Sequence, residues 1–294
     1  MDGRKGMMPE ISVITAFFNE ERFLAEAIES VIGQHYDSWE LILVDDGSAD
    51  SSTDIAQEYA ARYPGKISCV QHERGENKGL SASRNLGISR ARGALIAFLD
   101  ADDVWRREKL QVQAGIMHAC PQAAMLCEAS EYWYSWEKPS AQDVIIPVGV
   151  KREGLFDPPE LINLLYPLSG GAAPCPSGII VRRSALEKYR GFEAHFTGKY
   201  QLYEDQAFLH KIYLNEPVYI SPLCHNRYRQ RAGSLVRQVT GEGNYHVVRQ
   251  YFLQWLREYM AEHKIVYPGI DNLLRRALCR YRHPVVRWWA RLFY

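Results

Sequence analysis

Residues 41–48 read LILVDDGS, and residues 95–103 read LIAFLDADD. Each stretch opens with a short apolar run, Leu41–Val44 or Leu95–Leu99, and ends in aspartates. Apolar runs of this length and composition are typical of strands that are buried on both faces of a sheet. Ligands bind at the carboxyl ends of the strands in open α/β sheets, so we expect both acidic clusters to converge on one crevice.

The sequence around these stretches alternates between strand and helix signals. Further buried strands are expected at Ile11–Phe18 and Ile67–Gln71, and helices at Glu20–Ile32, Asp54–Tyr63 and Ser81–Ala91. This alternation is typical of a mostly parallel sheet that is flanked by helices on both faces. The sequence therefore predicts an α/β fold whose first half is Rossmann-like, with a mostly parallel central sheet.

The pattern becomes less regular after Asp103. We expect helices at Lys109–Cys120, Pro158–Tyr166, Tyr203–Asn215 and Tyr245–His263, a strand at Ser177–Arg182, a Gly- and Pro-rich loop at Ser169–Pro176, and an irregular aromatic segment at Glu128–Pro147. Residues 1–240 are expected to form one domain. Residues 241–294 are expected to form a helical, arginine-rich extension.

Composition excludes several classes of protein. The chain has 294 residues, 47% of them hydrophobic, and its 35 basic side chains balance 35 acidic ones. Duplex-binding proteins are more basic and disordered chains less apolar, so we expect a globular protein with no nucleic-acid partner. The six cysteines lack metal-ligand spacing and predict reduced thiols. Without a signal-peptide pattern or an apolar run of membrane length, a soluble, cytoplasmic protein is expected.

The acidic clusters suit divalent-metal chemistry on phosphates. Asp100 and Asp102 form a D-x-D pair. Mg²⁺ or Mn²⁺ binds one or two carboxylates together with phosphate oxygens and water, and it neutralises a departing diphosphate. Two structural alternatives compete with this interpretation. The D-x-D acids could cap a helix that begins near Lys109, and Asp46 could bond its own backbone in a turn.

Five motifs together resemble one known family. They are FFNEE at 17–21, ELILVDDGSAD at 40–50, NKGLSASRNLGISRARG at 77–93, FLDADDVW at 98–105 and YEDQAFL at 203–209. In this order and spacing they resemble the family 2 glycosyltransferases of the GT-A fold, over residues 10–235. The resemblance implies a nucleotide-sugar half at residues 10–105 and an acceptor half at residues 106–240.

The resemblance also implies roles for individual residues. Asp102 matches the metal-binding acid of D-x-D, with Asp100 facing the ribose or the metal, and Asp205 matches the catalytic base. Asp46 matches the residue that recognises the nucleotide base, commonly uracil. The other implied nucleotide-sugar contacts are Ala16, Phe18, Glu20, Gly79 and Arg84. The family usually has Pro-x-Tyr-Asn where this chain has AFFN, so a tyrosine hydroxyl contact is lost.

Arg231 is a second departure from the family pattern. Relatives often show R-x-H-x-x-S after the base, whereas residues 229–234 read RQRAGS. An arginine in place of the histidine could hold the diphosphate as a permanent cation. Arg229 and Arg231 are therefore candidate donor contacts, and His225 is expected to be structural.

Acceptor contacts are expected between D-x-D and the base. The candidates are Trp133, Trp136, Ser177, Gly178 and Glu204. Aromatic faces suit sugar rings, although plain packing in a core is the alternative for the tryptophans. The arginine-rich C-terminus, with Trp288 and Trp289, either rests on an anionic membrane or docks on its own domain.

The leading hypothesis is an inverting, non-processive glycosyltransferase that uses a nucleotide-sugar, most simply a UDP-sugar, with Mn²⁺ or Mg²⁺. Its expected acceptor is a glycan or lipid-linked glycan of a bacterial surface polysaccharide. Processive relatives carry membrane spans and a Q-x-x-R-W motif, which this chain lacks. One alternative is a sugar nucleotidyltransferase, although no Gly-rich triphosphate loop is seen. The other is a non-catalytic binding scaffold, which would not require a base such as Asp205.

Overall fold

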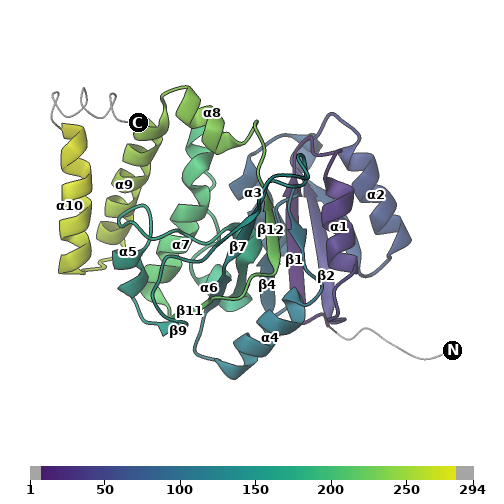
Figure 1. Ribbon diagram of the computed structural model, residues 1–294, viewed down its shortest axis with the longest axis horizontal. Coiled ribbons are helices and arrows are strands. Elements are labelled where there is room, and N and C mark those ends of the chain that lie inside the picture. The colour runs from purple at the N-terminus through teal and green to yellow at the C-terminus, as the bar shows by residue number, and fades with distance from the viewer. Residues whose placement is uncertain (1–7, 283–294) are drawn as a thin grey trace.

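The computed structural model describes residues 8–282. Its centre is an eight-stranded sheet of order β3-β2-β1-β4-β10-β6-β11-β9 (Figure 1). The strands are β1 (Ile11–Phe17), β2 (Trp39–Asp45), β3 (Ile67–Gln71), β4 (Leu95–Phe98), β6 (Met125–Glu128), β9 (Gly154–Phe156), β10 (Ile179–Arg182) and β11 (Val218–Ser221). Strands β1 to β4 are parallel, whereas β10 runs antiparallel to both β4 and β6. The predicted α/β fold with a mostly parallel sheet is confirmed.

Successive residues of the central strands alternate between two hydrophobic cores. Ile14 and Ile42 belong to one core, and Val13 and Leu43 to the other. The second core is covered by α1 (Leu24–Ile32), α2 (Ser52–Arg62) and α4 (Lys109–Ala119). The first is covered by α3 (Leu80–Arg90), α5 (Glu160–Leu164), α6 (Arg183–Lys188), α7 (Glu204–Asn215), α9 (Tyr245–Glu262) and α10 (Pro268–Arg282). Burial on both faces explains why β1 and β2 read as uninterrupted apolar runs.

The C-terminal helices pack against the part of the molecule that contains α5 and α7. Phe252 and Leu256 of α9 lie in the same core as Phe208 of α7. Helix α10 packs on α9 and lies at the opposite end of the molecule from α2 (Figure 1). A short helix, α8 (Leu235–Gly241), connects the sheet region to α9.

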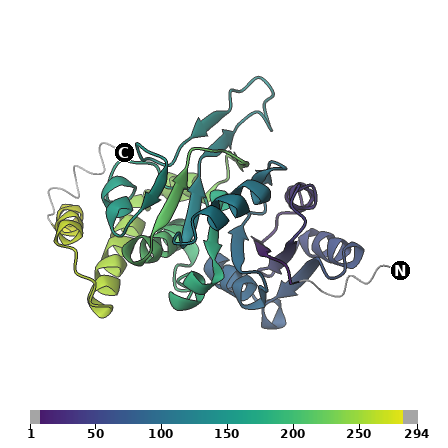
Figure 2. The ribbon, with the colours of Figure 1, turned by 90° about the horizontal axis from the view of Figure 1, so that it is seen from below.

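A second, four-stranded sheet was not predicted. Its order is β5 (Val104–Trp105), β12 (Asn226–Arg229), β7 (Ser130–Trp133) and β8 (Val144–Ile146). The expectation of an irregular segment at Glu128–Pro147 was therefore wrong. These strands are short and partly exposed, and β7 pairs with β12 from almost a hundred residues away. The β7–β8 hairpin extends away from the main body (Figure 2).

The order of the strands fixes where a ligand can bind. The chain runs outward from β1 through β2 to β3, and then returns to β4 on the other side of β1. In doubly wound sheets, ligands bind at the carboxyl ends of the strands beside such a reversal. Three 3₁₀ turns complete the described elements: η1 (Glu73–Gly75), η2 (Pro176–Gly178) and η3 (Gly198–Tyr203). The strand predicted at Ser177–Arg182 begins only at Ile179, because Ser177 and Gly178 belong to η2.

Candidate active site

A cavity of about 1360 Å³ opens at the carboxyl ends of β1, β2 and β4. The predicted site residues that line it are Ala16, Phe18, Glu20, Asp46, Gly79, Arg84, Asp100, Asp102, Glu204, Asp205 and Arg231. The acidic clusters after β2 and β4 and the Glu204–Asp205 pair therefore share one cavity.

The cavity is acidic. Its lining contains eight carboxyl side chains, namely Glu20, Asp46, Asp100, Asp102, Glu128, Glu204, Asp205 and Glu242, and four basic ones, namely Lys78, Arg84, Lys199 and Arg231. An excess of carboxylates in a partly desolvated cleft attracts cations.

Asp46 is held by the backbone of the loop that precedes α3. Its carboxylate accepts the backbone N–H of Lys78 at 2.8 Å and that of Gly79 at 3.0 Å. Gly79 has φ +87°, a conformation that side chains other than glycine rarely adopt. The local turn bond expected as the structural alternative belongs instead to Asp45, which accepts the N–H of Ser48 at 2.8 Å. The carboxylate of Asp46 is thus fixed in the cavity wall by the loop that precedes α3.

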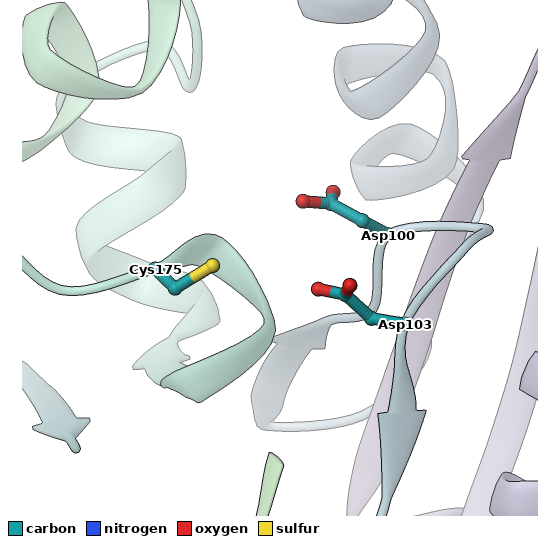
Figure 3. Close-up of side chains that lie close together, drawn as sticks. All are labelled: Asp100, Asp103 and Cys175. Carbon is teal, nitrogen blue, oxygen red and sulfur yellow. The ribbon is translucent and has the colours of Figure 1, made fainter. Parts of the chain in front are cut away.

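Figure 3 shows Asp100, Asp103 and Cys175, whose potential ligand atoms all lie within 4.8 Å of one another. Asp103 is fully buried, and its carboxylate accepts the hydroxyl of Ser177 at 2.6 Å and the backbone N–H of Arg229 at 2.9 Å. Burial raises the pKa of Asp103 well above its usual value, and burial also raises the pKa of the Cys175 thiol. Asp103 therefore links residues 100–103, here called the acidic loop, to η2 and β12. Because two of its three members favour their protonated forms, the trio is a poor cation site.

The acidic loop does not cap the following helix. Helix α4 begins at Lys109, after β5, and its N-cap residue is Glu108 without a side-chain cap hydrogen bond. The capping alternative for the D-x-D acids is therefore wrong.

Asp102 faces the cavity beside Arg231. Its Oδ2 lies 2.7 Å from Nη2 of Arg231. Burial raises the pKa of Asp102 to about 6, although the positive charge of Arg231 opposes this shift. Asp100 is also partly exposed to the cavity. Carboxylate oxygens in an acidic cleft that is open to a phosphate ligand fit the preference of Mg²⁺ and Mn²⁺ for oxygen donors.

Arg84 joins two groups of acids across the cavity floor. Its Nη2 donates to Oδ1 of Asp100 at 2.6 Å, and its Nη1 makes a close ion pair with Glu204. The guanidinium also lies 5.1 Å from the ring centroid of Phe192. Burial lowers the pKa of Arg84, but the two carboxylates outweigh this effect and raise it. A buried, permanently charged fork thus holds Asp100 and Glu204 in place.

Glu204 and Asp205 are the first two residues of α7. Burial raises the pKa of Glu204 to about 7 and that of Asp205 to about 6. The backbone N–H of Gln206, which donates to Asp205 at 2.6 Å, and the charge of Arg84 oppose the shift at Asp205. A carboxyl group with a pKa near 6 is ionised at neutral pH and still accepts a proton, as a general base must.

Five predicted contacts do not line the cavity. They are Trp133, Trp136, Ser177, Gly178 and Arg229. The Arg229 guanidinium lies 4.3 Å from the ring centroid of Trp133 and 5.0 Å from that of Trp136. Ser177 is fully buried and accepts the backbone N–H of Asp100 at 3.1 Å. Ser177 and Arg229 thus hold the acidic loop in place by hydrogen bonds. His225 donates its backbone N–H to Glu128 at 3.2 Å and does not line the cavity.

Several cavity residues were missed by the sequence analysis. They include Tyr132, Tyr166, Gly171, Tyr228, Leu235, Val239 and Tyr245. Tyr132 lines the cavity whereas its neighbour Trp133 does not, because successive side chains of a strand point to opposite faces. The run of aromatic residues at 132–136 indicated that aromatic rings line the site. Which of these rings face the cavity depends on the register of β7, which the sequence pattern did not reveal.

Two further expectations concern the whole chain. Across residues 8–282, no helix is both long enough and apolar enough to cross a membrane. The six cysteines are free thiols. The predicted membrane contact through Trp288 and Trp289 lies outside the described residues.

Residues 12–190 match the family model described as Glycosyl transferase family 2. EpsE of Bacillus subtilis (strain 168), named as a glycosyltransferase, is 44% identical over 109 residues. TuaG of the same organism, named as a teichuronic acid biosynthesis glycosyltransferase, is 39% identical over 109 residues. Each alignment covers 37% of this chain, and they cover 38% and 42% of the relatives. The chain thus matches less than half the length of either relative.

Solved structures support the same fold. S. aureus TarS 1-349 in complex with UDP aligns with a TM-score of 0.64 at 19% sequence identity, covering 92% of this chain and 71% of that chain. The family match extends from β1 through β10 and so contains the loops that carry Asp46, Asp100 and Asp102. The family match favours a glycosyltransferase over the alternatives of a nucleotidyltransferase and a non-catalytic binding protein. The chain belongs to the family 2 glycosyltransferases and has their GT-A fold.

Proposed function

We propose that the protein transfers a sugar from a UDP-sugar to a hydroxyl group of a glycan or lipid-linked glycan, with inversion at the anomeric carbon. The observation that carries this proposal is that Asp46, Asp102 and Asp205 line one cavity. Recognition of the nucleotide base, neutralisation of the diphosphate and acceptance of a proton each need one of these groups. A binding protein without catalysis would need no proton acceptor there.

The nucleotide end of the cavity supports a uridine donor. Phe18 is 47% exposed and presents an aromatic ring at the cavity wall. The Asp46 carboxylate accepts the backbone N–H groups of Lys78 and Gly79 and the hydroxyl of Ser83. One acceptor position on Oδ2 remains for an imide N–H. TarS, which shares the fold of this chain, was crystallised with UDP, in agreement with such a donor.

Asp102, together with Asp100, would hold a Mg²⁺ or Mn²⁺ ion. The fit rests on the oxygen donors of these carboxylates and on the acidic lining of the cavity. When bound, the ion would neutralise the charge that develops on the departing nucleoside diphosphate. Arg84 keeps Asp100 oriented from below through its hydrogen bond.

Asp205 accepts the proton of the acceptor hydroxyl while that oxygen attacks the anomeric carbon. The bond between the anomeric carbon and the diphosphate oxygen breaks in the same step, and the nucleoside diphosphate leaves with the electron pair. This single displacement inverts the configuration at carbon. Burial raises the pKa of Asp205 to about 6, which makes it a stronger base than an exposed aspartate and leaves it ionised at neutral pH.

The remaining wall of the cavity supports an acceptor that contains sugar rings. Its aromatic members are Tyr132, Tyr166, Tyr228 and Tyr245. Aromatic side chains combine apolar faces with hydroxyl groups that hydrogen-bond, as a sugar requires. TuaG is named for teichuronic acid biosynthesis, and we extend this to a role in cytoplasmic synthesis of a cell-surface polysaccharide, with one sugar added per encounter.

The test measures release of nucleoside diphosphate from UDP-, GDP- and dTDP-sugars, with Mn²⁺ or Mg²⁺ and no acceptor. We expect slow, metal-dependent hydrolysis of the UDP-sugar. Asp205→Asn should lower this rate by about 10²–10⁴-fold, the usual contribution of a general base, without changing UDP affinity. Hydrolysis at the wild-type rate in Asp205→Asn would remove the base from the mechanism. Failure of the wild type to bind any of the nucleotides would contradict the proposed function as a whole.

A further inference from the structure

Arg231 holds the carboxylate that the proposed function assigns to the metal. Its Nη2 lies 2.7 Å from Oδ2 of Asp102, and its two terminal nitrogens donate to the two oxygens of Glu20 at 2.9 and 2.8 Å. All three side chains line the cavity and are partly exposed to it, at 30% for Arg231, 18% for Glu20 and 17% for Asp102. The guanidinium therefore stands against Asp102 where a metal ion would bind.

The backbone on both sides fixes this arrangement. Arg231 lies just beyond the end of β12, and that end is tied to the acidic loop. The backbone N–H of Arg229 donates to Asp103, and Nε of Arg229 donates to the carbonyl of Asp102 at 2.6 Å. Because these bonds fix the end of β12, they also fix the position of Arg231 beside Asp102. An arginine on a mobile surface loop would have no such restraint.

We propose that Arg231 is a positioning residue that makes divalent-metal binding depend on the nucleotide diphosphate. In the free protein the guanidinium pairs with Asp102 and Glu20, so a metal ion must displace it. A diphosphate offers the planar guanidinium new oxygen partners, to which its fork of donors is well matched. Asp102 is then released to the metal. This inference rests on the proposed function, because it assumes a nucleotide-diphosphate donor.

For two reasons, we expect the metal ion to replace the Arg231 guanidinium at Asp102 rather than to bind Asp102 together with it. A guanidinium has no lone pair and no accessible neutral form, so it cannot become a metal ligand as a histidine can. Two cations in contact with the same carboxylate also repel each other. Placing the diphosphate between them removes this repulsion. Metal and nucleotide are therefore coupled through Arg231 in addition to any direct contact between them, and such coupling is reciprocal.

The experiment measures Mn²⁺ affinity by electron paramagnetic resonance, with and without saturating UDP. The ratio of the two affinities is the coupling factor. We expect Arg231→Gln to bind Mn²⁺ alone roughly tenfold more tightly than the wild type and to lose roughly tenfold of the coupling factor. Arg231→Lys, which keeps the charge but not the fork, should give an intermediate coupling factor.

Arg227→Gln is the matched control. Arg227 lies on β12, donates to Glu131 at 2.9 Å and does not line the cavity. It should retain the wild-type coupling factor, and a thermal melt of each variant checks that it is folded.

The outcomes separate this inference from the proposed function. If Arg231 acted only through its electric field, removing it would strengthen Mn²⁺ binding but leave the coupling factor unchanged, and that result would overturn the inference. An equal loss of coupling in Arg227→Gln would overturn it as well. In both cases metal-dependent UDP binding by the wild type would still support the proposed function. Absence of UDP binding by the wild type would contradict both the inference about Arg231 and the proposed function.

Discussion

Arg84 compensates the negative charge at the cavity floor, because its buried guanidinium forms ion pairs with both Asp100 and Glu204. Burying a charged pair is costly, and removing one member of such a pair leaves the other uncompensated. Glu204 therefore depends on Arg84 to remain ionised, since burial raises its pKa to about 7 even with that partner. The neighbouring Asp205 depends on the same guanidinium, whose charge lowers its pKa against the effect of burial.

Asp205→Asn should have opposite effects on activity and stability. The wild-type kcat/KM should rise with pH to a plateau, with an apparent pKa of about 6, because the base must be ionised. The folded protein binds this proton more tightly than the unfolded chain, so the carboxyl group stabilises the fold below pH 3.8. That stabilisation is lost as the pH rises through about 6. At pH 8, Asp205→Asn should therefore raise the free energy of unfolding by about 1–3 kcal/mol.

Denaturant titrations of the wild type and Asp205→Asn at pH 4 and pH 8 check this sign. The two proteins should have similar stability at pH 4 and should diverge at pH 8. A variant that is less stable than the wild type at pH 8 would show that the ionised carboxylate stabilises the fold, contrary to the cause assigned to its pKa.

One wall of the cavity, which includes Gly171, is shaped by close backbone contact between two loops. A Cβ on Gly171 would lie 2.5 Å from the carbonyl oxygen of Gly149 and 2.6 Å from that of Leu164. The N–H of Gly171 also donates to Leu164 at 3.0 Å. Only a residue without a side chain permits this approach. The loop after α5 is therefore a shaped part of the cavity rather than a passive connection.

Gly171→Ala should force these loops apart. We expect a loss of about 1–3 kcal/mol of stability, as in other overpacked sites, and a higher KM for the acceptor. Hydrolysis of the donor without acceptor should change little, because the proposed donor contacts Asp46 and Asp102 lie on the loops after β2 and β4. Gly170→Ala is the control, since a Cβ there meets nothing within 4 Å. Equal effects of both substitutions would show that the close approach at Gly171 is unimportant.

The C-terminal helices and the catalytic region share one hydrophobic core. Phe252 of α9 is fully buried, and its ring stacks on Tyr203 with centroids 5.1 Å apart. Tyr203 immediately precedes the Glu204–Asp205 pair. Because apolar contacts across this interface stabilise both partners, α9 and the start of α7 should unfold together.

Phe252→Ala should lower the free energy of unfolding by about 3–5 kcal/mol, the usual cost of removing a buried aromatic ring. Far-UV and near-UV circular dichroism should report a single, coincident transition in denaturant. Val247→Ala is the control on the same helix, since Val247 is 46% exposed, and it should change stability by less than about 0.5 kcal/mol. Loss of the α9 signal before the rest of the molecule unfolds would contradict a shared core.

Prediction from sequence succeeded where the pattern is local. The strands β1, β2 and β4 are buried on both faces and read as short apolar runs, so their ends locate Asp46 and Asp102. It failed for the second sheet, because β7 is stabilised by pairing with the distant β12 rather than by its own periodicity. Without the register of β7 against β12, the sequence could not show that Tyr132 lines the cavity and Trp133 does not. The pairing of Arg231 with Asp102 also depends on β12 and carries no local signal.

The ion pair between Arg84 and Glu204 joins residues 120 positions apart. It limits how this enzyme can be recombined with its relatives. A chimera that takes residues 10–105 from one parent and residues 106–240 from another inherits Arg84 and Glu204 from different sources. If either parent lacks its member, the hybrid carries a lone buried charge beside Asp205, the proposed base. Exchange of donor specificity by grafting should therefore succeed only when the arginine and the glutamate are transferred as a pair.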